Sequence, residues 1–421
     1  MLAEILLFCK ALGLTFQQIY THLSLALSPR LHRLTYRSVE NPRNVVVIGA
    51  SFAGYHVARC LASSLPTGYR VVVVEKNSHL QVTWVLPRFS VVRGHEHKAF
   101  IPYGSYLSTV PRGSYEWVRD TAEQVVVDED GRGKVQLGSG KTIDFEYLVI
   151  ATGASATLPS RVGVTTKREG MELLTIEQDR LVAATDVVVL GGGPAGIELA
   201  GDAKSRYPEK NVTLVHSRNT LLNDNFGPTL AKRAFEELVN VGVCVKLGER
   251  ASVDGIEETG TVQLHSGETI PCDYLAKCIG QRPNSALIEA LSPKSVSASG
   301  HIRVRPTLQL ADSTLDRIYA AGDVIELNCI RNARSAFEQA RYVANNIVSF
   351  IRSKKQAEYH YSWWEGATKL TLGLTKSVAY MSDGSAEISL SMKGKEEMDS
   401  PMIWRFFGAK AFVDETDDKV D

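Results

Sequence analysis

Two glycine-rich motifs in the chain have the spacing of dinucleotide-binding loops. In each, an apolar run leads into glycines that must open a helix, whose free N–H groups receive a pyrophosphate. The two motifs start 142 residues apart (191 − 49), so we expect the chain to hold two dinucleotides at once. The first, VVVIGASFAG, contains Gly49, Ala50, Ser51, Phe52, Ala53 and Gly54, and the second, VVVLGGGPAG, contains Gly191, Gly193 and Gly196.

The residue about 20 positions after each motif indicates which dinucleotide binds. Glu75 follows Gly54 by 21 residues, and its carboxylate suits the ribose hydroxyls of FAD or NAD while repelling a 2′-phosphate. His216 follows Gly196 by 20 residues. With Arg218 it can donate to the 2′-phosphate of NADPH or tolerate the plain ribose of NADH, so we expect NAD(P)H there. The alternative is that His216 is a solvated residue at a strand end.

Two further motifs are typical of a flavoprotein. FEYLVIATGAS places Ala151, Thr152 and Gly153 at the end of a strand, and DRIYAAGDV places Gly322 and Asp323 between a strand and a helix. Asp323 can accept from a ribityl hydroxyl there, and it can equally serve as an ordinary N-cap. We therefore expect non-covalent FAD at the first motif.

The cysteines indicate how electrons leave the flavin. No two of the six have C-x-x-C or C-x4-C spacing, which predicts that no redox-active disulfide lies beside the flavin. Electrons must then pass directly to a small acceptor. Scattered single cysteines also favour a reducing compartment over secretion, and we expect no metal site.

The order of these motifs resembles the pyridine nucleotide-disulfide reductase superfamily from about Asn44 to Ile347. Within it, LPRFSVVRGHEHKAFIPY, GGGPAGIELAGD and YAAGD are similar to the apoptosis-inducing-factor-like branch. That branch includes the mitochondrion-associated-inducer-of-death type, also called ferroptosis suppressor proteins. The resemblance implies an FAD-dependent NAD(P)H oxidoreductase that reduces a quinone.

The resemblance also implies roles for single residues. It places Arg88 and Asp323 on the flavin, Lys98 near it, the backbone of Val118 on the adenine, and Glu198 facing the nicotinamide. The alternative for Glu198 is an acid favoured by the helix dipole in a first turn.

Three more residues are candidates for the acceptor side. Glu338 and Gln339 lie on the helix after Asp323, and we expect them to line the isoalloxazine or the acceptor. Lys369 could neutralise the reduced flavin or a quinol.

These residues need an α/β fold with two Rossmann-like domains and a C-terminal α+β region. Expected strands cover 71–75, 186–190, 212–216 and 243–247, and expected helices cover 229–241 and 333–350. Short strand-like runs lie at 369–374, 377–381 and 387–392. The FAD-binding domain is expected in two segments (44–155 and 280–353) with the NAD(P)H-binding domain inserted between them (156–279), preceded by an N-terminal amphipathic or anchor segment (1–43) and followed by the C-terminal region (354–421).

The charge of the chain excludes one class of partner. Lys and Arg total 47 and Asp and Glu total 47, and no basic run marks a nucleic-acid surface.

The resemblance also implies a role for the C-terminal region. In the resembled superfamily, this region packs over the flavin and forms either the acceptor entrance or the surface of a homodimer.

The N-terminal segment lies outside the resemblance. Residues 2–28 are mostly apolar, with one polar stripe through Lys10, Gln17, Thr21, Ser24 and Ser28. Three interpretations compete: an interfacial or spanning membrane anchor, a mitochondrial presequence, and a helix packed on the body. No glycine follows Met1, so a myristoyl anchor cannot form. We expect association with a mitochondrial membrane or with the cytoplasmic face of another membrane.

Two other functions are compatible with the same two dinucleotide-binding sites. One is a biosynthetic flavoenzyme that acts on a specialised metabolite. The other is a redox-responsive effector, in which NAD(P)H binding alters partner binding and turnover is incidental.

Overall fold

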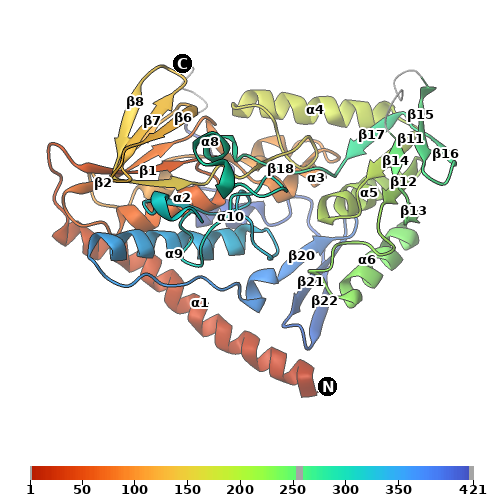
Figure 1. Ribbon diagram of the computed structural model, residues 1–421. Coiled ribbons are helices and arrows are strands. Elements are labelled where there is room, and N and C mark those ends of the chain that lie inside the picture. Colours follow the sequence, from red (N-terminus) through yellow and green to blue (C-terminus); the bar gives the residue numbers. More distant parts are fainter. Residues whose placement is uncertain (1, 253–258, 417–421) are drawn as a thin grey trace.

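The computed structural model describes residues 2–252 and 259–416, and it is built on two parallel sheets (Figure 1). The first sheet contains β1 (Arg43–Ile48), β2 (Tyr69–Val74), β5 (Tyr115–Val118), β9 (Tyr147–Ile150) and β19 (Ile318–Ala320). Their order is β19-β9-β1-β2-β5, and every pair is parallel. The second sheet contains β11 (Asp186–Leu190), β12 (Asn211–His216), β13 (Cys244–Leu247) and β17 (Tyr274–Lys277), in the parallel order β13-β12-β11-β17. This arrangement confirms the predicted fold class.

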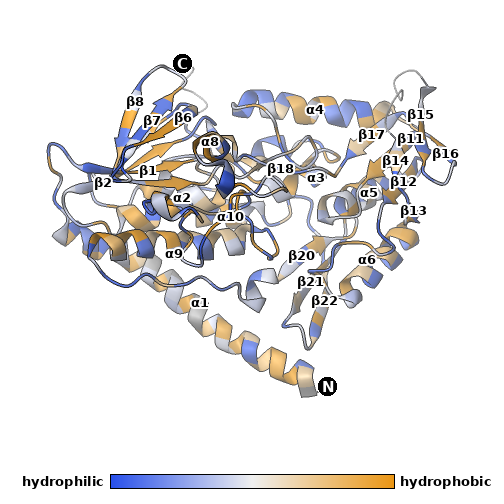
Figure 2. Ribbon diagram, in the orientation of Figure 1, coloured by the Kyte–Doolittle hydropathy of each residue, from blue (hydrophilic) through white to orange (hydrophobic). Residues whose placement is uncertain are grey.

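The central strands are apolar because both faces of each sheet are covered. Val45, Val46 and Val47 of β1 are fully buried, as expected for a parallel strand between two layers. Helix α2 (Phe52–Ala62) follows β1, and α9 (Ala333–Ile351) packs against α2. The second sheet is followed in the same way by α5 (Pro194–Arg206) after β11 and α6 (Pro228–Val241) after β12. Figure 2 shows apolar residues along the strands of both sheets.

Smaller elements surround the two sheets. We call the unit built around the first sheet the first half of the molecule, and the unit built around the second sheet the second half. The first half adds β3 (His79–Gln81), β4 (Phe100–Pro102), β6 (Ala122–Val127), β7 (Gly133–Leu137), β8 (Thr142–Phe145), β10 (Ala154–Ser155), α3 (Leu86–Phe89) and α4 (Lys167–Ala183). The second half adds β14 (Ala251–Ser252), β15 (Thr261–Leu264) and β16 (Thr269–Pro271). The chain then returns to the first half with β18 (Arg282–Pro283), which pairs with β10, and α8 (Ala286–Leu291), whose Ile288 lies in the first core. The 3-10 turns are η1 (Thr83–Val85), η2 (Glu96–Ala99), η3 (Ser105–Leu107), η4 (Pro293–Ser295), η5 (Ser313–Leu315) and η6 (Trp363–Gly366).

The C-terminal region joins the two halves of the molecule. It contains the antiparallel strands β20 (Thr368–Thr371), β21 (Lys376–Ser382) and β22 (Glu387–Lys393), then α10 (Ser400–Phe406). Leu370 and Val378 of the strands lie in the core of the second half. Ile403 and Trp404 of α10 lie in the core of the first half. The region therefore holds the two dinucleotide-binding halves together.

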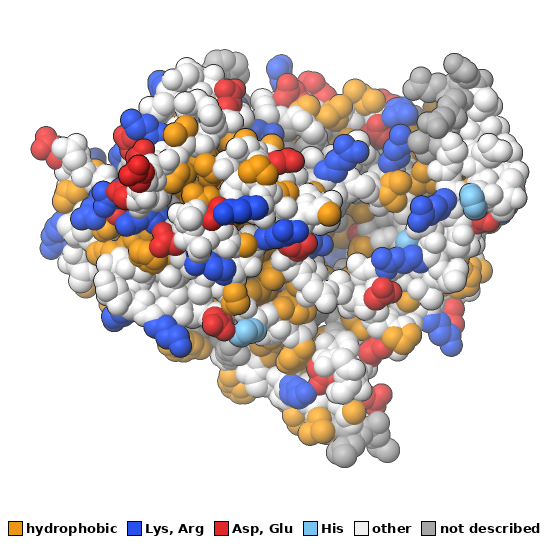
Figure 3. Space-filling model, viewed as in Figure 1, with side chains coloured by type: hydrophobic (Ala, Val, Ile, Leu, Met, Phe, Trp, Pro, Cys, Tyr) orange, Lys and Arg blue, Asp and Glu red, His pale blue; other side chains and the backbone are white. Residues whose placement is uncertain are grey.

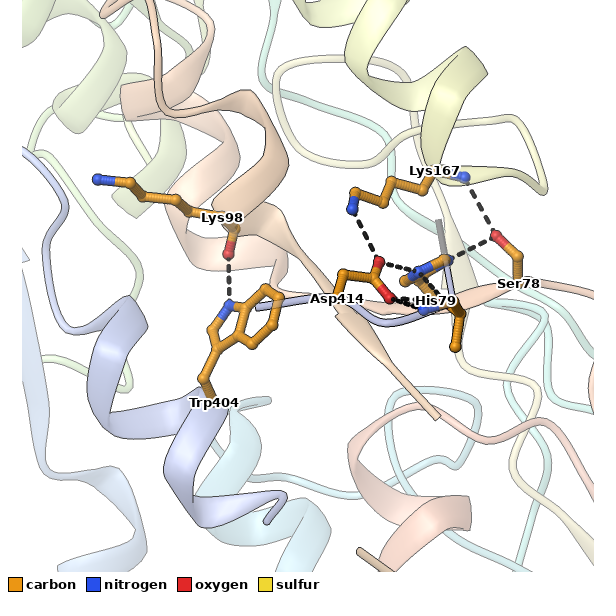
Figure 4. A network of polar contacts seen from close by, with 7 residues as sticks. Ser78, His79, Lys98, Lys167, Trp404 and Asp414 are labelled. Atoms are coloured by element: carbon orange, nitrogen blue, oxygen red, sulfur yellow. Dashed lines mark hydrogen bonds and ion pairs between the residues drawn. The ribbon is translucent and has the colours of Figure 1, made fainter. Parts of the chain in front are cut away.

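A buried ion-pair network ties the end of this region to the first half (Figure 4). Asp414 accepts hydrogen bonds from Lys167 and from His79 Nε2, each at 2.7 Å. His79 Nδ1 lies 2.8 Å from Ser78 Oγ, and the indole N–H of Trp404 donates to the carbonyl of Lys98. Burial alone would raise the pKa of Asp414, but hydrogen bonds from Lys167, Thr416 and His79 hold it well below its usual range.

The N-terminal segment forms one helix, α1 (Leu2–Thr35). Its last part packs on the first half: Arg33 donates to the carbonyls of Ser108 and Val110, and Tyr36 beyond it donates to that of Tyr69. Its first part lies against β22, where Lys10 pairs with Asp383 at 2.5 Å. The side chain of Gln17, a member of the expected polar stripe, lies outside the described residues. No helix within the described ranges is both long and apolar enough to cross a membrane.

Candidate functional site

The first glycine motif forms a tight turn between β1 and α2. Gly49 has φ +90°, and a Cβ there would lie 2.5 Å from the carbonyl oxygen of Ala151. A Cβ on Gly54 would lie 1.8 Å from the carbonyl oxygen of Gly49. Ser51 is the N-cap residue of α2 and makes no side-chain cap bond. The helix start is therefore open to an anionic ligand at close range, which fits the pyrophosphate of FAD.

Glu75 lies at the end of β2 and supports this turn. Its Oε2 accepts from the N–H of Ala50 at 2.5 Å, and its Oε1 accepts from the N–H of Asn77 at 2.7 Å. Burial raises the pKa of Glu75, and these backbone donors act against that rise.

The second motif repeats this geometry between β11 and α5. Gly191 has φ +112°, Gly193 is the N-cap residue of α5, and a Cβ on Gly196 would lie 1.9 Å from the carbonyl oxygen of Gly191. His216, at the end of β12, accepts from the N–H of Gly192 through Nδ1 at 3.0 Å. Burial lowers the pKa of His216, and Arg218 adds to that lowering. His216 is therefore partly buried and lies against the glycine turn at the end of its strand.

One large cavity of about 1910 Å³ connects the two motifs. Its wall includes Gly49, Ser51, Phe52, Ala53 and Glu75 from the first motif and its ribose strand, and Gly193 and Glu198 from the second. Ala151, Thr152, Gly153, Gly322 and Asp323 also line it. The structure thus brings most of the predicted cofactor residues to a common space that is wide enough for two nucleotides.

Gly322 and Asp323 follow β19 at the wall of this cavity. Gly322 has φ +86°, and its N–H donates to Oε1 of Gln339 at 2.8 Å. Gln339 is buried and does not line the large cavity, so it positions the Gly322 turn from behind. Asp323 accepts from Arg161 at 2.6 Å.

Glu198 belongs to a buried cluster with two carboxyl groups and one cation. Its Oε1 accepts from the N–H and the hydroxyl of Thr371, each at 3.0 Å. Asp202, one turn further along α5, accepts from Nε of Arg88 at 2.6 Å. Burial raises the pKa of Glu198 to about 8, and nearby Asp202 adds to this rise. Burial also raises the pKa of Asp202, to about 6, against the pull of Arg88. Near pH 7 the Glu198 carboxyl is therefore protonated and able to donate a hydrogen bond.

The acceptor-side candidates Glu338 and Lys369 both line the cavity. Glu338 pairs with Arg341 at 2.9 Å, and Lys369 pairs with Asp399 at 3.0 Å. An apolar part of the wall lies nearby, formed by Phe52, Trp84, Phe337, Met398, Met402 and Phe406. The rings of Phe337 and Phe406 are 4.9 Å apart, and those of Phe52 and Trp84 are 5.1 Å apart.

Other predicted residues lie away from the cavity. Arg88 is completely buried, and its guanidinium is occupied by Asp202 and by the carbonyls of Gly373 and Lys395. This environment does not support the expected flavin contact. Lys98 pairs with Glu397 and lies over the ring of Phe412. The carbonyl of Val118 accepts from the N–H of Glu75, and Asp120, Thr121 and Ala122 line the cavity in its place. Arg218 is half exposed beside Asp224.

Three residues of the site, Arg161, Asp202 and Thr371, were not predicted from the sequence. Asp202 carried a usable signal, because it follows Glu198 by four residues and so shares its helix face. Thr371 and Arg161 carried none, since only the tertiary fold brings them to the site.

The six cysteines are all free thiols. Cys278 and Cys329 line the cavity, and burial raises the pKa of each thiol, to about 12 and about 11. Among the described residues, no group of three or more His, Cys, Asp and Glu side chains could hold a metal ion.

Sequence comparison agrees with this geometry. Residues 43–340 match the family model described as pyridine nucleotide-disulphide oxidoreductase. Fe-regulated protein 8 of Mycosarcoma maydis is 32% identical over 384 residues, covering 86% of this chain and 94% of that protein. Ferroptosis suppressor protein 1 of Homo sapiens is 27% identical over 354 residues, covering 82% of this chain and 88% of that protein.

Solved structures share the fold at low identity. The sulfide:quinone oxidoreductase from Aquifex aeolicus superposes with a TM-score of 0.69 at 17% identity, covering 86% of this chain and 90% of that one. The ferredoxin reductase for the CYP199A2 system from Rhodopseudomonas palustris gives 0.63 at 22% identity, covering 84% of this chain and 91% of that one. These likenesses establish the fold.

Proposed function

Because the chain belongs to the pyridine nucleotide-disulphide oxidoreductase family, we propose that this protein passes electrons from NAD(P)H to a quinone-like small molecule. It is an NAD(P)H-dependent flavin oxidoreductase whose cofactor is FAD. Our proposal concerns the electron acceptor, which we take to be a quinone-like small molecule. It is supported by the apolar wall of the cavity, which joins the space between the two glycine motifs.

Each region of the cavity has a separate task in this proposal. The Gly49–Gly54 turn, Glu75 and Asp323 hold FAD, which supplies the redox chemistry when bound. The Gly191–Gly196 turn holds the pyrophosphate of NAD(P)H. Glu198, protonated near pH 7 and held by Thr371, donates a hydrogen bond to the nicotinamide amide.

The apolar wall suits a flat, lipid-soluble acceptor. Phe337 and Phe406 offer two aromatic surfaces, and Met402 beside them adapts to ring substituents. Lys369 supplies a cation at the same wall, where it favours negative charge arriving on the acceptor. All six thiols are free, which supports direct transfer to a small molecule.

The experiment is steady-state oxidation of NADH and NADPH by the purified holoenzyme with a short-chain soluble quinone. We expect quinone to accelerate oxidation well beyond the rate with oxygen alone. Phe406→Ala should raise the KM for quinone several-fold and leave reduction of ferricyanide, a small hydrophilic acceptor, unchanged. Quinone that fails to accelerate turnover would contradict the proposal and favour a specialised metabolite as the substrate.

We also propose that the outer face of α1 rests on a membrane surface, either mitochondrial or facing the cytoplasm. Among the described side chains of α1, eleven large apolar ones are each at least half exposed: Ile5, Leu6, Phe8, Leu12, Phe16, Ile19, Tyr20, Leu23, Leu27, Leu31 and Leu34. In Figure 3, apolar side chains gather at the lower end of the molecule, where α1 lies. No acid occurs from residue 5 to residue 39, whereas Lys10, Arg30, Arg33 and Arg37 do. A long apolar face with basic residues is typical of helices that lie in a lipid interface.

A further inference from the structure

Arg161 and Asp323 form an ion pair on the wall of the large cavity. Arg161 lies in the segment between β10 and α4, and a terminal nitrogen of its guanidinium lies 2.6 Å from Oδ2 of Asp323. The two side chains are 19% and 23% exposed, so both reach the cavity. Nε of Arg161 is buried and has no hydrogen-bond partner within the described part of the chain. That nitrogen is closed off from the cavity, but Asp323 uses only one of the two terminal nitrogens, so the other can donate to a ligand in the cavity.

The backbone fixes this ion pair next to the first glycine motif. A Cβ on Gly322 would lie 3.0 Å from the Cβ of Ala53, which is in the first turn of α2. The Gly322 turn is held there by the buried amide of Gln339. Asp323 thus lies beside the start of α2, which is where the pyrophosphate of a dinucleotide binds in this fold.

This position creates an electrostatic conflict that Arg161 can resolve. A pyrophosphate carries two negative charges, and Asp323 adds a third nearby. The motif residues on the cavity wall, Gly49, Ser51, Phe52 and Ala53, carry no charge. The helix end contributes only about half a positive charge. A carboxylate beside a phosphate is unfavourable unless a cation lies between them.

We infer that Arg161 is an FAD-binding residue, whose guanidinium bridges the Asp323 carboxylate and the pyrophosphate of the cofactor. The planar fork of arginine suits this role because it can donate to a carboxylate and to a phosphate from different edges. Asp323 then serves two purposes: it accepts from the flavin side and it orients Arg161.

The test is titration of FAD into apoprotein, followed by flavin fluorescence or calorimetry. Arg161→Gln should raise the Kd for FAD at least tenfold, and Arg161→Lys should recover some of the loss because it restores the charge without the fork. Arg180→Gln is the matched control. It removes the same charge from the exposed face of α4, where Arg180 pairs with Glu177, and should leave the Kd unchanged.

Two further measurements separate a phosphate contact from a structural role. The wild-type Kd should rise with salt concentration, and the Arg161→Gln Kd should rise less steeply because one ionic contact is gone. Adding Asp323→Asn to Arg161→Gln should cost less than the sum of the two single losses, since it removes an unbalanced carboxylate. Wild-type affinity in Arg161→Gln would overturn the inference. So would a tenfold loss with an unchanged salt dependence, which would mean that Arg161 only holds the loop.

Discussion

Glu75 and His216 hold equivalent positions in the two halves of the molecule. Glu75 directly follows the second strand of its nucleotide-binding unit and His216 is the last residue of the second strand of the other, and each accepts a hydrogen bond from the second residue of its glycine turn. The distances are 2.5 Å from the N–H of Ala50 to Glu75 and 3.0 Å from the N–H of Gly192 to His216. Because Nδ1 of His216 is the acceptor, its neutral ring carries the proton on Nε2, which has no partner in the described residues.

This equivalence predicts the effect of His216→Glu on coenzyme choice. The new carboxylate can accept from Gly192 as Glu75 does from Ala50, and it repels a 2′-phosphate. The NADPH/NADH ratio of kcat/KM should fall at least about tenfold, equivalent to 1.4 kcal/mol. NADH turnover should survive, because Glu198 and the glycine turn are unchanged. An unchanged ratio would mean that the 2′-phosphate does not approach residue 216.

Alanine at the third glycine of each motif should separate the two binding sites. Gly54→Ala places a Cβ 1.8 Å from a carbonyl oxygen, so the protein should be purified with little FAD. Gly196→Ala produces the same clash in the other half, so that protein should keep its yellow colour and lose reduction by NAD(P)H. Absorbance and stopped-flow reduction measure the two properties. Gly13→Ala, where a Cβ meets no atom within 4 Å, is the control. Normal flavin content in Gly54→Ala would contradict the assignment of the first motif.

Glu198→Gln should change how stability depends on pH. Burial raises the pKa of Glu198 to about 8, above the value of about 4.3 in an unfolded chain. The carboxyl therefore contributes full stability below about pH 4.3 and loses it as the pH rises toward 8. Glutamine cannot ionise, so the variant should gain at least about 1.4 kcal/mol on wild type between pH 5 and pH 8. Denaturant titrations of the holoenzymes measure this difference. Glu172→Gln, at an exposed position of α4, is the control and should show no such trend. If the free energies of unfolding of Glu198→Gln and wild type change with pH in parallel, Glu198 is ionised throughout.

Deletion of residues 2–27 tests the proposed membrane contact. The deletion keeps Arg33 and Tyr36, which bond to the first half of the body, so the protein should fold and retain FAD. Flotation with anionic liposomes should be lost, while oxidation of NADH with a soluble acceptor continues. The double variant Phe16→Asp, Tyr20→Asp, at two side chains more than 70% exposed, should lose flotation without any deletion. If the deletion variant is purified without flavin, α1 belongs to the core of the protein. If the full-length protein is a dimer that dissociates on deletion, the apolar face of α1 binds a second copy of the chain.

The fold was accessible from sequence because its signals are local. The strand predicted at 186–190 has those bounds in the structure, and the helix predicted at 229–241 is α6, Pro228–Val241. Apolar runs, glycine turns and helical periodicity act over a few residues, so they can be read without knowledge of the tertiary contacts.

The side-chain environment of the site was less accessible. The family resemblance placed Arg88 on the flavin, but its guanidinium is taken by Asp202 and two backbone carbonyls from distant segments. Val118 and Lys98 lie off the cavity for the same kind of reason, because partners far along the chain decide which way they face. In α1, the apolar periodicity predicted a helix but did not indicate which face of that helix packs against the rest of the molecule.

Glu198 and Thr371 are separated by 173 residues, and the carboxyl of the first is held by the second. A fragment that stopped before β20 would keep both glycine turns and both parallel sheets, and a motif search would find nothing missing. Its Glu198 would nevertheless lose both hydrogen bonds from Thr371. Splice forms, gene fusions and designed chimeras of this architecture should therefore be judged by whether β20 returns to α5, since possession of both nucleotide signatures does not guarantee a coenzyme site.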